Sequence, residues 1–208
     1  MPRAKRLLAV AAFLSYPILC HSAVALSDAR WAAAGVALLG WAVATGWLGT
    51  LGGAVLGAIL LASALLLASV FPAAVLYAPP LALNLALCAL FGLSLLGRRE
   101  PLVSRFARIE RGETLPADLA GYTRGLTAAW TFFFALMAAI SAALALRASE
   151  AAWSLFTNLV NYLLVALFFA LEYAYRRIRF RHYAHAGPAE FVRRLATYRI
   201  FAPPARRH

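Results

Sequence analysis

The stretch WAAAGVALLGWAVATGWLGTLGGAVLGAILLASALLLASVF, residues 31–71, decides the fold of this chain and contains no charged residue. A transmembrane helix needs about 20 predominantly apolar residues, so this stretch is long enough to cross a bilayer twice. The division is expected near residue 49, which gives spans over 31–48 and 49–70. Three glycines then recur on one helix face, where they permit another helix to approach closely: Gly49, Gly53 and Gly57.

The rest of the chain is also apolar. Of its 208 residues, 63% are hydrophobic and the mean hydropathy is +0.75. One soluble core could not bury so many long apolar runs. Prolines 72, 79 and 80 are expected to break the chain before the fourth span. The sequence therefore predicts an all-α, polytopic membrane protein with about six transmembrane helices, the other four of which cover residues 7–26, 80–96, 125–146 and 152–173.

The positive charges indicate the topology. The chain has 20 Lys and Arg, 8 Asp and Glu, and a net charge of +12. Most of the basic residues lie in three groups: at the amino terminus, between the fourth and fifth spans, and from Arg176 to Arg207. Cytoplasmic loops retain Lys and Arg, so all three groups and both termini are expected in the cytoplasm. Four spans before the loop and two after it satisfy this requirement.

The expected organisation has four parts. Within the loop, Pro101 should start an amphipathic helix that ends at Gly112 and lies in the membrane interface. A second short amphipathic helix is expected after Pro188. The first span resembles a signal peptide that ends near Ala25, although its retention as a span is favoured. The four parts are a four-span segment (1–96), a basic cytoplasmic loop (97–124), a two-span hairpin (125–175) and a basic cytoplasmic tail (176–208).

Several classes of function find no support in the sequence. Nucleic-acid binding is disfavoured, because the positive charge flanks apolar segments and no compact basic domain remains. The sequence has no His-x4-Asp acyltransferase pair, no Gly-rich phosphate loop and no CDP-alcohol transferase aspartate cluster, so no catalytic residue and no cofactor are expected. His182 and His185 have ligand-like spacing, but only His21 and His208 could join them. Cys20 and Cys88 have no metal-binding spacing either, so no metal site is expected.

The first candidate site is a stripe of polar residues within the membrane. Polar side chains at this depth should face protein or water, so the stripes of the last two spans are expected to face each other. Such a groove could hold a lipid headgroup, the end of an acyl chain or an ion. Alternatively, the side chains fix helix register, with Glu172 paired to Arg176 at i+4. The stripe comprises Asn84, Thr127, Thr131, Ser154, Asn158, Asn161, Glu172 and Arg176, which Thr123 and Ser141 extend on the fifth span.

The second candidate site is a set of arginines in the basic loop. Three of them recur at i, i+3 and i+6, so on a helix they spread over an arc of about 120°. They could simply hold the loop inside and bind anionic lipid, for which any cation would serve. Alternatively, they could dock a specific acidic partner through the planar guanidinium group. The set comprises Arg98, Arg99, Arg105, Arg108 and Arg111.

A resemblance to a known protein family suggests a biosynthetic pathway for this chain. GRREPLVSRFARIERGE at 97–113 is similar to the central loop of a family of small bacterial inner-membrane proteins. WSLFTN at 153–158 and the segment 172–182 are similar too, and the resemblance extends over residues 80–183. Members of that family accompany gene clusters that make aryl polyenes, including xanthomonadin-type pigments. The family has no established activity, so the resemblance implies a pathway and no catalyst.

The expected function is that of an accessory protein of the bacterial inner membrane, and an enzyme is less favoured. It would recruit acidic acyl carrier proteins or their enzymes to the membrane, since complementary charge steers encounter. Membrane lipids are the other expected partners. Two alternatives stay open: a transporter or flippase of a lipid or polyene product, and a membrane acyl- or glycosyltransferase with no recognisable motif.

Overall fold

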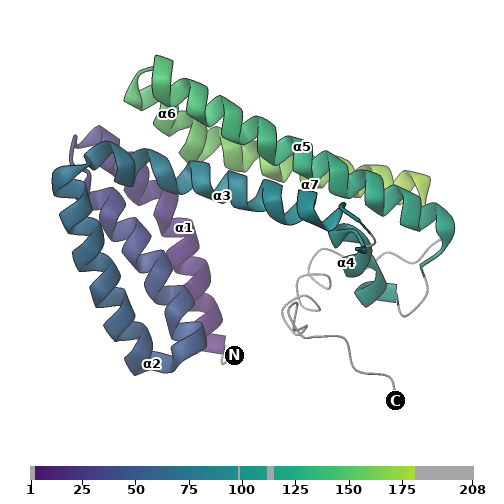
Figure 1. Cartoon of the computed structure of the whole chain (residues 1–208), viewed down its shortest axis with the longest axis horizontal. Helices are drawn as coiled ribbons and strands as arrows, with labels where there is room; N and C mark the ends of the chain where they lie inside the picture. Colours follow the sequence, from purple (N-terminus) through teal and green to yellow (C-terminus); the bar gives the residue numbers. More distant parts are fainter. Residues whose placement is uncertain (1–2, 98, 112–114, 181–208) are drawn as a thin grey trace. The chain divides into compact units, whose positions relative to one another are not determined.

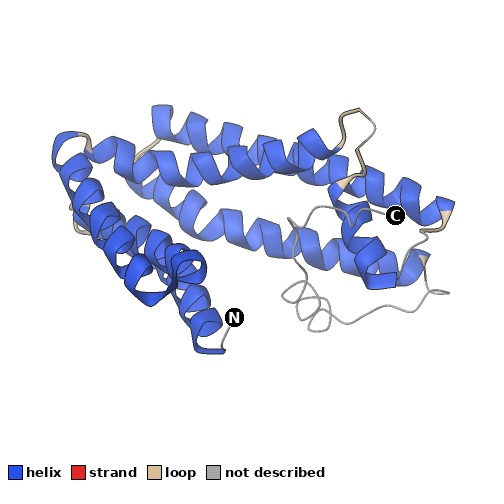
Figure 2. Ribbon diagram, turned by 60° about the horizontal axis from the view of Figure 1, so that its bottom comes forward, coloured by secondary structure: helices blue, strands red, loops and turns tan. Residues whose placement is uncertain are grey.

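The computed structural model describes residues 3–97, 99–111 and 115–180, and the expected helix after Pro188 lies outside them. The described residues form helices joined by short turns, and they include no strand (Figures 1 and 2). The predicted all-α class is therefore confirmed. The elements are α1 (Arg3–Ala25), α2 (Arg30–Val70), α3 (Pro72–Ser94), α4 (Leu102–Arg111), α5 (Ala117–Arg147), α6 (Glu150–Leu155), η1 (Phe156–Val160) and α7 (Asn161–Arg179).

Within the described residues, four helices are long and apolar enough to cross a membrane: Leu51–Val70, Pro72–Ser94, Ala117–Arg147 and Glu150–Arg179. The segment Ala11–Ala25 of α1 is apolar but shorter. The chain thus has the composition of a helical membrane protein. The count of six spans and the orientation of the termini stay predictions.

The chain divides into two compact units. Unit 1 contains residues 1–87 and 133–169, and unit 2 contains residues 88–132 and 170–208. In unit 1, α1 packs along α2 and also touches α6 and η1. Small side chains dominate the core of unit 1, which suits close helix packing. This core contains Tyr16, Cys20, Ala23, Ala32, Ala33, Ala64, Ala68, Val75, Leu76 and Trp153.

Helix α2 folds back on itself, as Figure 1 shows. A Cβ atom added at Gly53 would lie 2.6 Å from the Cα atom of Thr45, and one at Gly57 would lie 2.7 Å from Trp41 Cδ1. In a straight helix, Trp41 and Gly57 would be about 24 Å apart. The chain therefore reverses between Thr45 and Gly53, which confirms the division expected near residue 49. Gly53 is required there, because a side chain would collide with the backbone of the other half.

The expected break occurs at Pro72, because α2 ends at Val70, but the expected break at Pro79 and Pro80 is wrong. Helix α3 begins at Pro72 and runs through Pro79 and Pro80. Each of these two prolines lacks the N–H that would bond to the carbonyl four residues earlier. Asn84 lies one turn after Pro80; it is buried and donates from Nδ2 to the Pro80 carbonyl at 3.0 Å. The Asn84 side chain thereby finds its partner within its own helix, and membrane helices tolerate prolines such as these.

Helix α5 starts earlier than predicted. Residues 117–124 were assigned to the loop, yet α5 begins at Ala117. Pro116 precedes the helix, and its carbonyl accepts the first-turn bond from Ala120 N at 2.9 Å. Asp118 in the first turn is favourable beside the positive end of the helix dipole. These local signals extend the helix beyond the apolar segment, so hydropathy alone placed its start too late.

Candidate functional site

Helix α4 forms with the predicted bounds, directly after Pro101 and ending at Arg111. The first N–H groups of a helix have no partner within the helix. Here the neighbouring helices of unit 2 supply the partners. Leu102 N donates to Ser94 Oγ on α3 at 3.0 Å, and Val103 N donates to Thr127 Oγ1 on α5 at 3.3 Å. The start of α4 is therefore fixed to both flanking helices.

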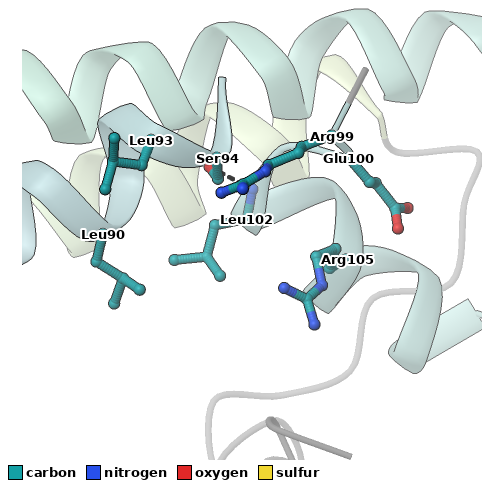
Figure 3. Close-up of a pocket in the computed structure, with 7 residues that line it drawn as sticks. All are labelled: Leu90, Leu93, Ser94, Arg99, Glu100, Leu102 and Arg105. Atoms are coloured by element: carbon teal, nitrogen blue, oxygen red, sulfur yellow. Dashed lines mark hydrogen bonds between the residues drawn. The ribbon is translucent and has the colours of Figure 1, made fainter. Parts of the chain in front are cut away.

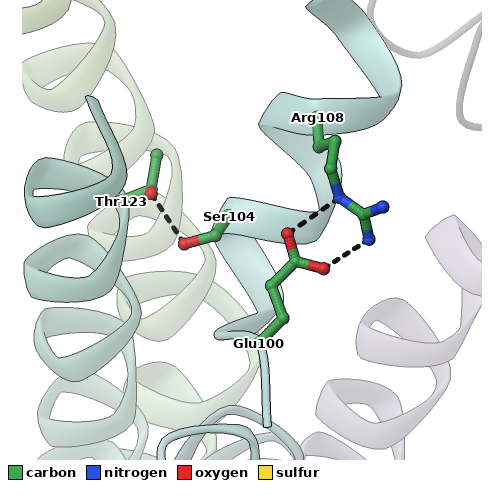
Figure 4. Close-up of polar contacts among 4 residues, drawn as sticks. All are labelled: Glu100, Ser104, Arg108 and Thr123. Atoms are coloured by element: carbon green, nitrogen blue, oxygen red, sulfur yellow. Dashed lines mark hydrogen bonds and ion pairs between the residues drawn. The ribbon is translucent and has the colours of Figure 1, made fainter. Parts of the chain in front are cut away.

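Ser104 gives α4 a further attachment. It is buried, and its Oγ lies 2.7 Å from Thr123 Oγ1 on α5 (Figure 4). The Thr123 hydroxyl donates to the Leu119 carbonyl at 2.9 Å, so the Ser104 hydroxyl is the donor to Thr123. Three side chains from two helices thus position α4. Ser94 and Ser104 were not among the predicted site residues, because no periodic pattern singles out a lone serine.

The contacts of the α5 threonines correct an expectation. Thr123 and Thr127 contact α4 as described, and a Cβ added at Gly92 on α3 would lie 3.1 Å from Thr131 Cγ2. This polar stripe of α5 therefore packs against α3 and α4. The sequence placed it opposite the stripe of the last span, and that is wrong for these three residues. Polar spacing shows which face is inward, but it does not show which helix covers that face.

The loop arginines differ in their surroundings. Arg108 forms an ion pair with Glu100, in which Nε donates to Oε1 at 2.9 Å and Nη2 contacts Oε2 (Figure 4). Such a two-bond pair is geometrically specific. Arg99 and Arg105 are exposed. Arg98 lies outside the described residues, as does the side chain of Arg111.

An open hollow of about 500 Å³ lies beside α4 in unit 2. Figure 3 shows leucines of α3 on one side of it and charged residues on the other, with Leu102 between them. The hollow combines apolar surface with two guanidinium groups. Its lining residues are Leu90, Leu93, Ser94, Arg99, Glu100, Leu102 and Arg105.

Glu172 belongs to a polar cluster in unit 2. Its Oε1 accepts a hydrogen bond from the Tyr122 hydroxyl on α5 at 2.9 Å and lies 3.3 Å from Arg176 Nε. The expected i+4 pair is thus confirmed. The Tyr122 ring stacks on the Tyr175 ring and packs against the Phe180 ring, with distances between ring centroids of 5.7 Å and 4.9 Å. The cluster offers no unengaged carboxylate, so a structural role suits it best.

Ser154 lies in a second polar cluster, in unit 1. It is fully buried, and its Oγ lies 3.1 Å from His21 Nδ1 on α1. Asn158 Nδ2 donates to the same oxygen at 3.1 Å. Both neighbours converge on Ser154, whereas in a nucleophilic triad a third residue orients the base. The cluster therefore joins α1 to the last span.

The stripe of the last span is not regular. Residues 156–160 form the π-helical turn η1, in which Asn161 N bonds to the Phe156 carbonyl five residues earlier. The assumed rotation of 100° per residue is therefore broken between Ser154 and Asn161. The side-chain oxygens of Asn158 and Asn161 are buried and have no hydrogen-bond partner among the described residues. π-Helical turns occur often at functional sites, so this segment stays a candidate.

Among the described residues, no group of three or more His, Cys, Asp or Glu side chains could hold a metal ion. His182 and His185 lie outside that part of the chain. No protein-family model, curated protein or solved structure matches this chain. The link to aryl-polyene clusters therefore stays a hypothesis.

Proposed function

We propose that this protein is an accessory component of a bacterial inner membrane that gathers acidic acyl-carrier-type proteins at the cytoplasmic surface. The observation that carries the proposal is the attachment of α4, whose first residues are bonded to α3 and α5. This attachment holds Arg105 and the ion pair of Arg108 on a short helix beside two helices of membrane-spanning length. A surface that is ordered before binding loses less entropy on association.

Charge supports the same partner class. The chain carries a net charge of +12, and acyl carrier proteins are typically acidic, so their encounter would be steered electrostatically. The proposed pathway, aryl-polyene or related lipid biosynthesis, rests on the resemblance over residues 80–183. In this scheme the protein performs no reaction. It raises the local concentration of carrier-bound acyl chains near the membrane.

A charge-conserving triple substitution tests the proposal. Arg105→Lys, Arg108→Lys and Arg111→Lys keep the charge but remove the guanidinium fork, including the two-bond contact to Glu100. We expect weaker pull-down of the acyl carrier protein and less product in cells. The matched control carries Arg30→Lys, Arg177→Lys and Arg179→Lys, all at exposed arginines outside α4. If pull-down and product are both unchanged in the α4 variant, Arg-specific docking at α4 is wrong.

A second candidate function, transport of a lipid or polyene product, has its own observation. The buried side-chain oxygens of Asn158 and Asn161, in a helix of membrane-spanning length, have no donor within the part of the chain that the structure describes. Unsatisfied polar groups are costly there, and they favour a polar ligand that supplies the missing bonds. Asn158→Leu with Asn161→Leu should then abolish export of the product while its synthesis continues. Export at the normal rate in this double variant would rule transport through this segment out.

A further inference from the structure

We infer that the hollow beside α4 binds the phosphate of an anionic membrane phospholipid, with the start of its acyl chains against the leucines of α3. The two proposals share Arg105, but lipid binding needs no carrier protein and can be tested without one, so it does not depend on the function proposed above. The inference assigns an anionic, amphiphilic ligand to the hollow, whose seven lining residues include two arginines and three leucines.

The position of the hollow along α3 suits a lipid. Helix α3 has 23 residues, so it is about 34 Å long and slightly exceeds a hydrocarbon core of about 30 Å. Leu90 and Leu93 lie near its carboxyl end, which in a helix that spans the bilayer would be the level where acyl chains meet headgroups. They are three residues apart on one face, and their exposed fractions are 48% and 53%. Acyl chains would cover this face.

The charged side of the hollow suits a phosphate. Arg99 and Arg105 are exposed and line it together (Figure 3). Guanidinium groups bind phosphate oxygens through paired N–H donors. Glu100 is the one acidic residue in the lining, and it would repel an anion. Its carboxylate is engaged through both oxygens by Arg108, so that ion pair offsets the unfavourable charge.

The floor of the hollow is already formed. Leu102 is buried, and its N–H is bonded to Ser94 Oγ, another lining residue. A volume of about 500 Å³ falls within the range of ligand sites. It suits a headgroup with the first carbons of its chains. A free phosphate would use only the arginines, whereas the adjacent leucines favour an amphiphile. Basic pockets beside membrane helices bind anionic headgroups by this combination.

The test uses the full-length protein in nanodiscs that contain phosphatidylcholine with a minor share of phosphatidylglycerol, and no carrier protein. The lipid that stays bound on release from the nanodisc is measured by native mass spectrometry. The test variant carries Arg99→Gln and Arg105→Gln. The matched control carries Arg177→Gln and Arg179→Gln, which remove the same charge from exposed arginines that do not line the hollow. Circular dichroism checks that each variant folds.

Each arginine near a membrane surface changes lipid binding about fivefold, so the test variant should retain phosphatidylglycerol about thirtyfold more weakly than the wild type. The control should retain it normally. Equal loss in both variants, or no preference for phosphatidylglycerol in the wild type, would overturn the inference. Displacement of the lipid by inorganic phosphate alone would overturn the acyl-chain part. If the double variant does not fold, the single change Arg99→Gln at this exposed position should give the fivefold loss.

Discussion

Glu172 accepts a hydrogen bond from the Tyr122 hydroxyl at 2.9 Å and lies 3.3 Å from Arg176 Nε, so one carboxylate oxygen serves two partners. Tyr122 belongs to α5 and the other two residues to α7. The bond therefore connects two helices that are fifty residues apart at this point in the sequence. An acidic side chain that would be costly in a membrane helix is satisfied by a phenol and a guanidinium group.

Tyr122→Phe should destabilise the protein by about 1.5–3 kcal/mol, because it removes a hydrogen bond to a charged acceptor and keeps the ring contacts. Thermal unfolding in mild detergent measures the change. Tyr175→Phe is the control, since it also keeps a stacked ring and removes a hydroxyl from a residue that is 53% exposed. Equal unfolding temperatures for the two variants would show that the bond contributes nothing.

Gly53→Ala should destabilise unit 1 by about 1–3 kcal/mol, the usual range for overpacking. The new methyl group would meet the Thr45 backbone at 2.6 Å. Gly125→Ala provides the comparison, because nothing lies within 4 Å of a Cβ there. It should be neutral or stabilising by up to about 1 kcal/mol, as Ala favours helix. Thermal unfolding of both variants distinguishes these outcomes. A Gly53→Ala variant that unfolds at the wild-type temperature would mean that α2 does not fold back as described.

The contact between α1 and α6 can be checked by crosslinking. In a background with Cys20→Ala and Cys88→Ala, the pair His21→Cys and Ser154→Cys should form a disulfide readily. The two side chains bond at 3.1 Å in the native protein. His21→Cys with Leu155→Cys should react slowly, since Leu155 is 50% exposed and points to another face. Gel mobility after mild oxidation measures both rates, and the opposite order would disprove the contact.

The topology prediction concerns which turns lie outside the cell. Single cysteines at Ser27, Ala148 and Gly112 in a cysteine-free background would be treated with an impermeant thiol reagent. The distribution of Lys and Arg predicts labelling at Ser27 and Ala148 but not at Gly112. Labelling of Gly112 in intact cells would contradict the positive-inside assignment.

The local elements were largely readable from the sequence. Length predicted the division of α2, glycine spacing predicted a close helix contact there, and Pro101 with Gly112 predicted the bounds of α4. The i+4 pair of Glu172 with Arg176 was also predicted correctly. Each of these depends on residues close together in the chain, where spacing and propensity are informative.

Contacts between residues far apart in the sequence could not be predicted. Nothing in the sequence relates His21 to Ser154, which are 133 residues apart, or Ser104 to Thr123. The π-helical turn was missed because a helical wheel assumes constant rotation, and hydrogen bonds five residues apart leave no compositional mark. The helix through Pro79 and Pro80 was missed because proline was taken as a breaker, whereas membrane helices tolerate it. These features depend on which helices meet.

The reversal of α2 also constrains the order of events during synthesis. Trp41 leaves the ribosome sixteen residues before Gly57, the residue against which it packs. At about 5–20 residues per second, this delay is on the order of seconds. For that time the first half has only α1 beside it. Its Leu51–Val70 partner is long enough and apolar enough to cross a bilayer. Insertion of the two halves together, as a preassembled hairpin, would spare the first half a lone entry into lipid.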